Sequence, residues 1–256
     1  MNNRITRLFE QKKENILSIY FTAGFPNLED TTSIIQHLDE AGADLIEIGF
    51  PFSDPLADGE TIQKSSQVAL DNGMTVKLLF QQLENIRKHT EIPIILMGYL
   101  NPVMQYGEKA FVEKCAALGI DGLIIPDMPL SYYRNGMQSL FQANNLSNIL
   151  LITPETSEQR IRLIDAQSEG FIYMVSSNSI TGANKDLTHQ ATYFQKVNEM
   201  QLQNPRLIGF GIHDRASFAN ACAYSSGAII GSAFIKHLAK YGVSKNAINK
   251  FVKSIK

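Results

Sequence analysis

The chain has 256 residues, of which 44% are hydrophobic, with a net charge of -2 and a pI near 6.2. This size and composition allow a large core, and we expect one domain over residues 1–256. The near-neutral charge gives no broad attraction to nucleic acid or anionic lipid, so neither is an expected partner and a bound anion must be held locally.

The N-terminal stretch, Met1 to Asn15, has no signal-peptide apolar core, and nowhere do about 18 consecutive apolar residues occur, which predicts a cytoplasmic protein without a membrane span. Ile5, Leu8 and Phe9 share one side of a first helix. Three apolar residues are few for binding a membrane. We therefore expect this helix to pack on the protein or to plug a barrel, with membrane binding as the alternative.

Strand-like apolar runs follow, separated by segments with helical spacing of apolar residues. The runs are Ile16 to Thr22, Ala43 to Phe50, Pro93 to Tyr99, Gly122 to Pro126, Asn148 to Thr153, Gly170 to Ser176, Arg206 to Gly211 and Ala228 to Gly231. Thr75 and Ser157 are expected helix N-caps, and Gly42 falls where a helix should stop.

Strict alternation of strands and helices indicates a parallel sheet covered by helices, either closed into a barrel or open and doubly wound. The count of eight runs favours a (β/α)8 barrel. An open dinucleotide-binding fold should show G-x-G-x-x-G after its first strand, but the chain reads Thr22-Ala23-Gly24-Phe25-Pro26 there. A nicotinamide cofactor is therefore not expected.

The second run contains a carboxylate, Glu47, between Ile46 and Ile48. An ionised carboxylate in a strand buried on both faces loses several kcal/mol of hydration unless it is paired or protonated. Alternation places Leu45, Glu47 and Gly49 on one face, and a barrel carries its reactive groups at the carboxyl ends of its strands. Glu47 is thus a candidate acid or base. The alternative is a structural glutamate bonded to a neighbouring strand.

Asp58 lies in the loop after this run, where Asp54-Pro55 and Asp58-Gly59 are turn signals. Its spacing fits a site residue and an ordinary turn or N-cap equally well. A loop of this length with Pro and Gly at intervals is also suited to closing over a substrate.

The last three strand ends are rich in glycine: Ile180-Thr181-Gly182, Gly209-Phe210-Gly211 and Gly231-Ser232. Small residues let backbone N–H groups approach an anion, and barrels commonly bind phosphate at the loops after strands seven and eight. The pattern predicts a phosphate site, although glycines also end strands for steric reasons.

Other polar residues near strand ends are less specific. Tyr173 is equally a core aromatic or a pocket residue, and Asp127 is equally a turn residue or a site acid. His213 is expected to be a solvated loop residue. The five histidines form no ligand pattern, and Cys115 and Cys222, expected to be buried thiols, lack paired spacing, so no metal is expected.

Taken together, these residues resemble the tryptophan synthase alpha subunit family from end to end. The matching pieces are Phe21-Thr22-Ala23-Gly24-Phe25-Pro26, Glu47 with Pro51-Phe52-Ser53-Asp54-Pro55-Leu56-Ala57-Asp58-Gly59, Thr181-Gly182, Gly209-Phe210-Gly211 and Gly231-Ser232. The resemblance implies a (β/α)8 barrel with an extra N-terminal helix and short helices in its active-site loops. It also implies a lyase that cleaves indole-3-glycerol phosphate to indole and glyceraldehyde 3-phosphate.

The same resemblance implies residue roles. Glu47 would be the general acid/base, Asp58 would bind the indole N–H, and the substrate pocket would include Tyr173, Tyr20, Leu100 and Thr181. Phosphate would be held by Gly182, Gly211, Gly231 and Ser232. Asp127, Phe52 and Asp54 would couple the site to a beta subunit in an α2β2 heterotetramer, which joins indole to serine. No cofactor is implied for this chain, because pyridoxal phosphate would belong to the beta subunit.

Two departures from the family pattern stand out. Ser179 replaces a glycine two residues before Thr181-Gly182, which bears on closure of that loop, and the segment Met128 to Tyr133 lacks expected acidic residues, which bears on partner affinity. Two alternative functions follow. The chain could act mainly as an allosteric activator of the partner, or it could be a phosphosugar isomerase or another barrel lyase that shares only the phosphate site.

Overall fold

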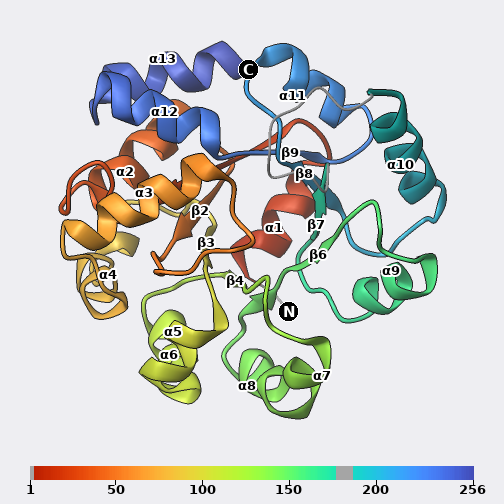
Figure 1. The fold of residues 1–256 in the computed structure, drawn as a ribbon, viewed down its shortest axis with the longest axis horizontal. Coiled ribbons are helices and arrows are strands. Elements are labelled where there is room, and N and C mark those ends of the chain that lie inside the picture. The colour runs from red at the N-terminus through yellow and green to blue at the C-terminus, as the bar shows by residue number, and fades with distance from the viewer. Residues whose placement is uncertain (1–2, 177–186) are drawn as a thin grey trace.

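A computed structural model describes residues 3–176 and 187–256, apart from the side chains of residues 187–190, and shows strands inside a ring of helices (Figure 1). The strands are β1 (Ile16–Thr22), β2 (Leu45–Gly49), β3 (Ile94–Met97), β4 (Gly122–Ile124), β5 (Ser147–Asn148), β6 (Leu150–Ile152), β7 (Ile172–Val175), β8 (Arg206–Gly209) and β9 (Gly227–Ile230). The α-helices are α1 (Arg4–Gln11), α2 (Thr31–Ala41), α3 (Glu60–Asp71), α4 (Val76–Gln82), α5 (Leu100–Tyr106), α6 (Glu108–Ala117), α7 (Leu130–Tyr132), α8 (Gln138–Ala143), α9 (Glu158–Asp165), α10 (Leu187–Glu199), α11 (Arg215–Cys222), α12 (Ser232–Tyr241) and α13 (Lys245–Ile255). A 3-10 turn, η1 (Ile86–Lys88), and a π-helical turn, η2 (Tyr133–Met137), complete the described elements.

The sheet closes into a barrel. Its order is β5-β4-β3-β2-β1-β9-β8-β7-β6, with parallel pairing throughout. The two ends of this order, β5 and β6, are separated by Ile149 alone, whose N–H donates to Leu123 O at 3.1 Å. They are therefore two halves of one barrel strand. The expected eight-stranded closed barrel is confirmed, and the expected strand from Asn148 to Thr153 is divided at Ile149.

Most strands are shorter than the apolar runs that predicted them. The run from Ala43 to Phe50 contains β2 over Leu45–Gly49, and the run from Arg206 to Gly211 contains β8 over Arg206–Gly209. The reason is that apolar residues continue into buried loop positions after the strand ladder has ended, as at Phe50, which is 3% exposed.

The expected N-caps Thr75 and Ser157 and the expected helix stop at Gly42 are confirmed. Thr75 accepts a hydrogen bond from Leu78 N, and Ser157 accepts one from Arg160 N. Gly42 ends α2 with a φ of 89°, a left-handed conformation that favours glycine.

Helix α1 covers the amino ends of the strands, as expected for a packed helix, and is seen through the middle of the ring in Figure 1. Ile5 is fully buried, and its Cγ2 lies 2.9 Å from the place where a Cβ on Gly170 would stand, so the small residue makes room for the helix. Asn3 Nδ2 donates to Asp121 O at 2.9 Å and to Ser147 Oγ at 2.8 Å. Membrane binding by this apolar face is therefore wrong, because the face is occupied.

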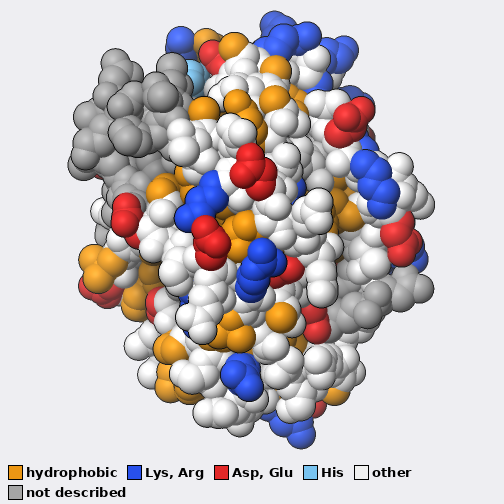
Figure 2. All heavy atoms as spheres, turned by 90° about the vertical axis from the view of Figure 1, so that its right-hand side faces the viewer, with side chains coloured by type: hydrophobic (Ala, Val, Ile, Leu, Met, Phe, Trp, Pro, Cys, Tyr) orange, Lys and Arg blue, Asp and Glu red, His pale blue; other side chains and the backbone are white. Residues whose placement is uncertain are grey.

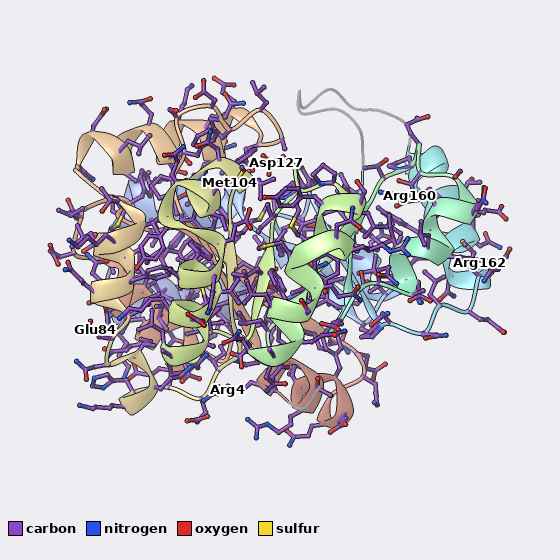
Figure 3. All side chains as sticks on the ribbon, turned by 90° about the horizontal axis from the view of Figure 1, so that it is seen from below. Arg4, Glu84, Met104, Asp127, Arg160 and Arg162 are labelled. Carbon is purple, nitrogen blue, oxygen red and sulfur yellow. The ribbon has the colours of Figure 1, made fainter. Side chains whose placement is uncertain are left out.

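The opposite end of the barrel carries the loops that follow the strands. Both α5 and α6 come after β3, so α5 is an additional short helix at this end, as expected. Arg4 and Asp127 mark the two ends in Figure 3.

The outer surface carries mixed charge. On the face of Figure 2, which includes the α9 and α10 side of the barrel, acidic and basic side chains are interspersed. Among the described helices, none has both the length and the apolar character to cross a membrane.

Candidate active site

Glu47 on β2 is completely buried. Ser18 on β1 donates from Oγ to Glu47 Oε1 at 2.7 Å, whereas Oε2 has no hydrogen-bond partner among the described residues. Burial raises the pKa of Glu47 to about 8, against a smaller opposing effect of the Ser18 hydrogen bond. A neutral carboxylic acid with one free oxygen is thus the stable form near neutral pH.

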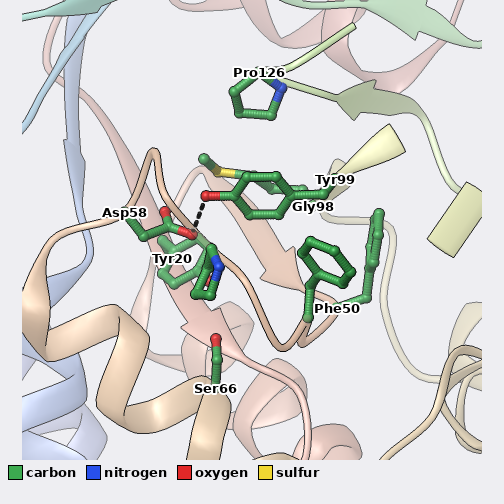
Figure 4. Close-up of a pocket in the computed structure, with 10 residues that line it drawn as sticks. Tyr20, Phe50, Asp58, Ser66, Gly98, Tyr99 and Pro126 are labelled. Atoms are coloured by element: carbon green, nitrogen blue, oxygen red, sulfur yellow. Dashed lines mark hydrogen bonds between the residues drawn. The ribbon is translucent and has the colours of Figure 1, made fainter. Parts of the chain in front are cut away.

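Glu47 shares a face of β2 with Gly49, and this face is turned toward Tyr20, since a Cβ on Gly49 would lie 2.0 Å from Tyr20 Oη. Burial, reinforced by the negative charges of Glu47 and Asp58, raises the pKa of the Tyr173 hydroxyl on β7 well above its ordinary value. In the ring, β7 is separated from β2 by β8, β9 and β1, so this influence acts across the interior. Asp58 lines the pocket of Figure 4 together with Tyr20, whereas Glu47 and Tyr173 are not among its lining residues and are connected with it only through their electrostatic effects.

Glycines on neighbouring strands make room for two tyrosines. A Cβ on Gly49 would lie 2.0 Å from Tyr20 Oη, and a Cβ on Gly209 would lie 2.2 Å from Tyr173 Oη. Since both distances are far below van der Waals contact, any side chain at these glycines would displace the phenols. The glycine at 209 therefore has a steric role, which is the alternative considered for the glycine-rich strand ends.

Asp58 lies on the loop between β2 and α3 and is 9% exposed. Tyr99 donates from its hydroxyl to Asp58 Oδ2 at 2.9 Å, and the two side chains meet at a pocket that Tyr20 also lines (Figure 4). Burial raises the pKa of Asp58 to about 6, opposed by the Tyr99 hydrogen bond. Asp58 is therefore mostly ionised at neutral pH, in contrast to Glu47.

The described glycine turns lie at the same end of the barrel. Gly211, with a φ of 76°, follows β8, and Ser176 Oγ donates to Phe210 O at 2.7 Å, which joins the ends of β7 and β8. Gly231 precedes α12 without a side-chain cap, leaving the helix N–H groups available for an anion, and it lies beside the Tyr20 ring. Ser232 is exposed at that helix start. Thr181, Gly182 and Ser179 lie outside the described residues.

The residues expected to couple to a partner, Phe52, Asp54 and Asp127, lie in the loops that follow β2 and β4. The Phe52 ring lies 5.4 Å from the Tyr99 ring, and Asp54 is exposed. Asp127 is exposed and accepts a hydrogen bond from Leu100 N at 2.9 Å, so it caps the first turn of α5 from the next loop. Leu100 itself is half-buried and does not line the pocket of Figure 4.

Sequence reasoning missed Ser18 and Tyr99. Ser18 shares the face of β1 that carries Tyr20, and strand alternation from Tyr20 could have found it. Tyr99 is the final residue of the run that begins at Pro93, and the rule that barrel sites lie at carboxyl strand ends could have found it. Ser18 bonds a residue of another strand, and Tyr99 bonds a residue of another loop. No local sequence pattern predicts such hydrogen bonds.

No group of three or more histidine, cysteine, aspartate or glutamate side chains is placed to hold a metal ion in the described parts of the chain. Cys115 is buried as expected, whereas Cys222 is only half-buried, because it lies at the exposed end of α11.

Comparison with known proteins gives one consistent result. The family model for the tryptophan synthase alpha chain matches residues 7–255. The tryptophan synthase alpha chain of Flavobacterium psychrophilum is 56% identical over 254 residues, covering 99% of both chains, and that of Parabacteroides distasonis is 53% identical over 255 residues, again with 99% of both covered. The tryptophan synthase alpha subunit of Legionella pneumophila, as a crystal structure, superposes with a TM-score of 0.90 at 31% identity, covering 100% of this chain and 97% of that one.

The closed barrel, with two carboxyl groups of unequal pKa at the carboxyl ends of its strands, places the chain among the (β/α)8-barrel enzymes. The matches over nearly its full length then give the particular family: the chain belongs to the tryptophan synthase alpha chain family, whose members are lyases of tryptophan biosynthesis.

Proposed function

We propose that this chain cleaves indole-3-glycerol phosphate to indole and glyceraldehyde 3-phosphate by a retro-aldol reaction in which Glu47 transfers both protons. Family membership supports the reaction. The observation that carries the residue assignment is the fully buried Glu47 carboxyl, whose Oε2 has no hydrogen-bond partner among the described residues, and which lies next to Tyr20, a residue that lines the pocket of Asp58.

In the proposed first step, neutral Glu47 protonates C3 of the indole ring, which places positive charge on the indole nitrogen. Glu47, now a carboxylate, removes the proton from the hydroxyl next to C3. That oxygen becomes the aldehyde carbonyl, the bond between C3 and its side chain breaks, and the electron pair returns to the ring. One carboxyl suffices because its pKa of about 8 lets it donate and accept a proton near neutral pH.

Asp58 is proposed to accept a hydrogen bond from the indole N–H and to offset the positive charge on that nitrogen. Its pKa of about 6 keeps it ionised while Glu47 is neutral. Two carboxyls whose pKa values are driven apart by their surroundings can take different roles in one site. Tyr173, Tyr20, Leu100 and Thr181 are proposed to form the walls around the indole.

Phosphate is proposed to bind at Gly211, Gly231 and Ser232, together with Gly182. The support is the uncapped start of α12 beside the Tyr20 ring, where unpaired N–H groups and the helix dipole favour an anion.

We also propose that the chain works with a tryptophan synthase beta chain in an α2β2 assembly in the cytoplasm, and that it passes indole to that partner. A tryptophan synthase complex from Pyrococcus furiosus superposes with a TM-score of 0.86 at 30% identity, which supports an assembly of this kind. Asp127, Phe52 and Asp54 are proposed to couple the two sites. The chain is proposed to need no cofactor or metal of its own, and pyridoxal phosphate to reside on the partner.

The assignment is tested by measuring indole release from indole-3-glycerol phosphate by the Glu47→Gln variant, with and without the beta chain. We expect loss of at least a hundredfold, because general acid–base catalysis typically contributes about 10²- to 10⁴-fold. Glu169→Gln is the matched control, since burial also raises the pKa of Glu169, at the amino end of β7. Full activity of Glu47→Gln would overturn the assignment, and no indole release by the parent chain while it still stimulated the beta chain would favour the activator role.

A further inference from the structure

Tyr99 links the end of β3 to the loop between β2 and α3, two segments that are not neighbours in the sequence. It follows β3 and immediately precedes α5, whereas Asp58 belongs to the loop after β2. Its hydroxyl accepts a hydrogen bond from Ala57 N at 2.9 Å and donates one to Asp58 Oδ2 at 2.9 Å. One phenol thus fixes both the backbone and the side chain of neighbouring loop residues.

The position of the Tyr99 ring is itself constrained. The side chain is 7% exposed, and the ring lies against Phe52 at the start of the same loop. The next residue, Leu100, is held through its N–H by Asp127. Because the ring is fixed from the β3 end and the loop side, its hydroxyl has little freedom to leave Asp58.

The Tyr99 hydroxyl bonds only one of the two carboxylate oxygens of Asp58. Among the described residues, Oδ2 accepts from Tyr99 and Oδ1 has no hydrogen bond. Figure 4 shows the Tyr99 hydroxyl meeting one carboxylate oxygen while the other points away.

We propose that Tyr99 is a positioning residue that orients Asp58 so that Oδ1 receives the indole N–H of the substrate. This inference rests on the proposed function, because it presupposes that Asp58 binds the indole. Tyr99 does not act on the reacting atoms; it acts through Asp58.

Removing the hydroxyl has two defined consequences. Tyr99→Phe keeps the ring against Phe52 but leaves Ala57 N–H and Asp58 Oδ2 without this partner. Because the hydrogen bond favours the ionised carboxylate, its loss raises the pKa of Asp58 further above its usual range. The phenols that face the site, Tyr20 and Tyr173, stay neutral because burial raises their pKa values, and Glu47 titrates only near pH 8.

The test compares Tyr99→Phe with Tyr106→Phe, which removes a phenol hydroxyl from the far end of α5 while its ring contacts with Phe80 and Phe111 remain. We expect Tyr99→Phe to lower kcat/KM for indole release roughly ten- to a hundredfold, the range for loss of a hydrogen bond to a charged group. The acidic limb of its pH profile should move to higher pH. Tyr106→Phe should leave both unchanged.

A double variant separates positioning from a general structural role. If Tyr99 acts through Asp58, adding Tyr99→Phe to Asp58→Asn should cause little further loss; a full additional loss would overturn the inference. An unshifted acidic limb in Tyr99→Phe, with Asp58→Asn inactive, would overturn it and leave the proposed function standing. Full activity of Asp58→Asn alone would instead remove the role of Asp58 on which both depend.

Discussion

At the scale of single residues, the site depends on two carboxyl groups that burial affects unequally. Glu47 loses all contact with water and retains one hydrogen bond, while Asp58 stays at the pocket edge. The result is a neutral acid and a carboxylate at the same pH, a division of roles that composition alone could not produce.

The first prediction concerns the pH dependence of kcat/KM for indole release. Asp58 must be ionised, so activity should rise with pH through about 6, and Glu47 must be protonated, so activity should fall through about 8. A steady-state profile from pH 5 to about 9.5 checks this bell shape. The residual activity of Asp58→Asn should lack the acidic limb, and a flat profile in the parent chain would contradict the assignment.

The second prediction concerns stability. The folded pKa of Glu47, about 8, lies above its ordinary value of 4.5, so the folded state binds the proton more tightly than the unfolded state. The free energy of unfolding should therefore fall as pH rises from about 4.5 to about 8, by about 1.4 kcal/mol per pH unit at most from this group. Urea titrations should show Glu47→Gln gaining stability relative to the parent over that window. If the difference in unfolding free energy between Glu47→Gln and the parent did not change with pH, the pKa of Glu47 would not be raised by folding.

At the scale of elements, each of the two tyrosines leans over a glycine on the neighbouring strand, two positions beyond the residue that it pairs with. Tyr20 on β1 lies over Gly49 on β2, and Tyr173 on β7 lies over Gly209 on β8. The same arrangement on two strand pairs gives two bulky phenols room beside the neighbouring strand, and one of them, Tyr20, lines the pocket.

The third prediction follows from that packing. Gly49→Ala should destabilise the fold by about 1–3 kcal/mol, a typical cost of overpacking, and should reduce indole release because Tyr20 has to move. Gly136→Ala is the matched control, since nothing lies within 4 Å of its added Cβ and it should be neutral or slightly stabilising. Denaturant unfolding and kcat/KM measure the two effects. Parent-like values of both for Gly49→Ala would contradict the prediction, because they would show that Tyr20 can move aside without cost.

Element-level prediction from sequence was accurate for the type and order of strands and less so for their ends. Hydrophobic periodicity reports burial, and burial extends past the strand ladder into Phe50 and its neighbours. The division of one strand at Ile149 depends on where β4 and β7 offer partners, so it has no local signal.

At the scale of the whole molecule, the closed barrel has one end that is covered by packed residues and an opposite end that carries the candidate site. Helix α1 and Asp121 occupy the amino ends of the strands, and the candidate site occupies the carboxyl ends. That residues 1–256 form one domain stays a prediction, and it is consistent with a ring joined by β1, near the start of the chain, and β9, near its end.

The fourth prediction uses phosphate as a ligand of the whole fold. Inorganic phosphate at a hundred times its dissociation constant should raise the free energy of unfolding by about 2.7 kcal/mol. Ser232→Asp should remove most of this effect, because it places a negative charge at the proposed phosphate site. The variant should still fold, since a negative charge at the N-terminus of α12 stabilises the helix. Ser244→Asp, at the N-cap of α13, adds the same charge elsewhere and should leave the effect intact. An unchanged phosphate effect in Ser232→Asp, measured by thermal unfolding, would place the anion elsewhere.

The sequence by itself determined the barrel class, the order of its elements and the family, because periodicity and the motif around Glu47 and Asp58 are local properties of the chain. Tertiary structure alone decided that Ser18 bonds Glu47, that Tyr99 holds Asp58, and that Asp127 caps α5 from another loop. These contacts join residues 27 to 41 positions apart, and only the closure of the ring sets which side chains meet across those gaps.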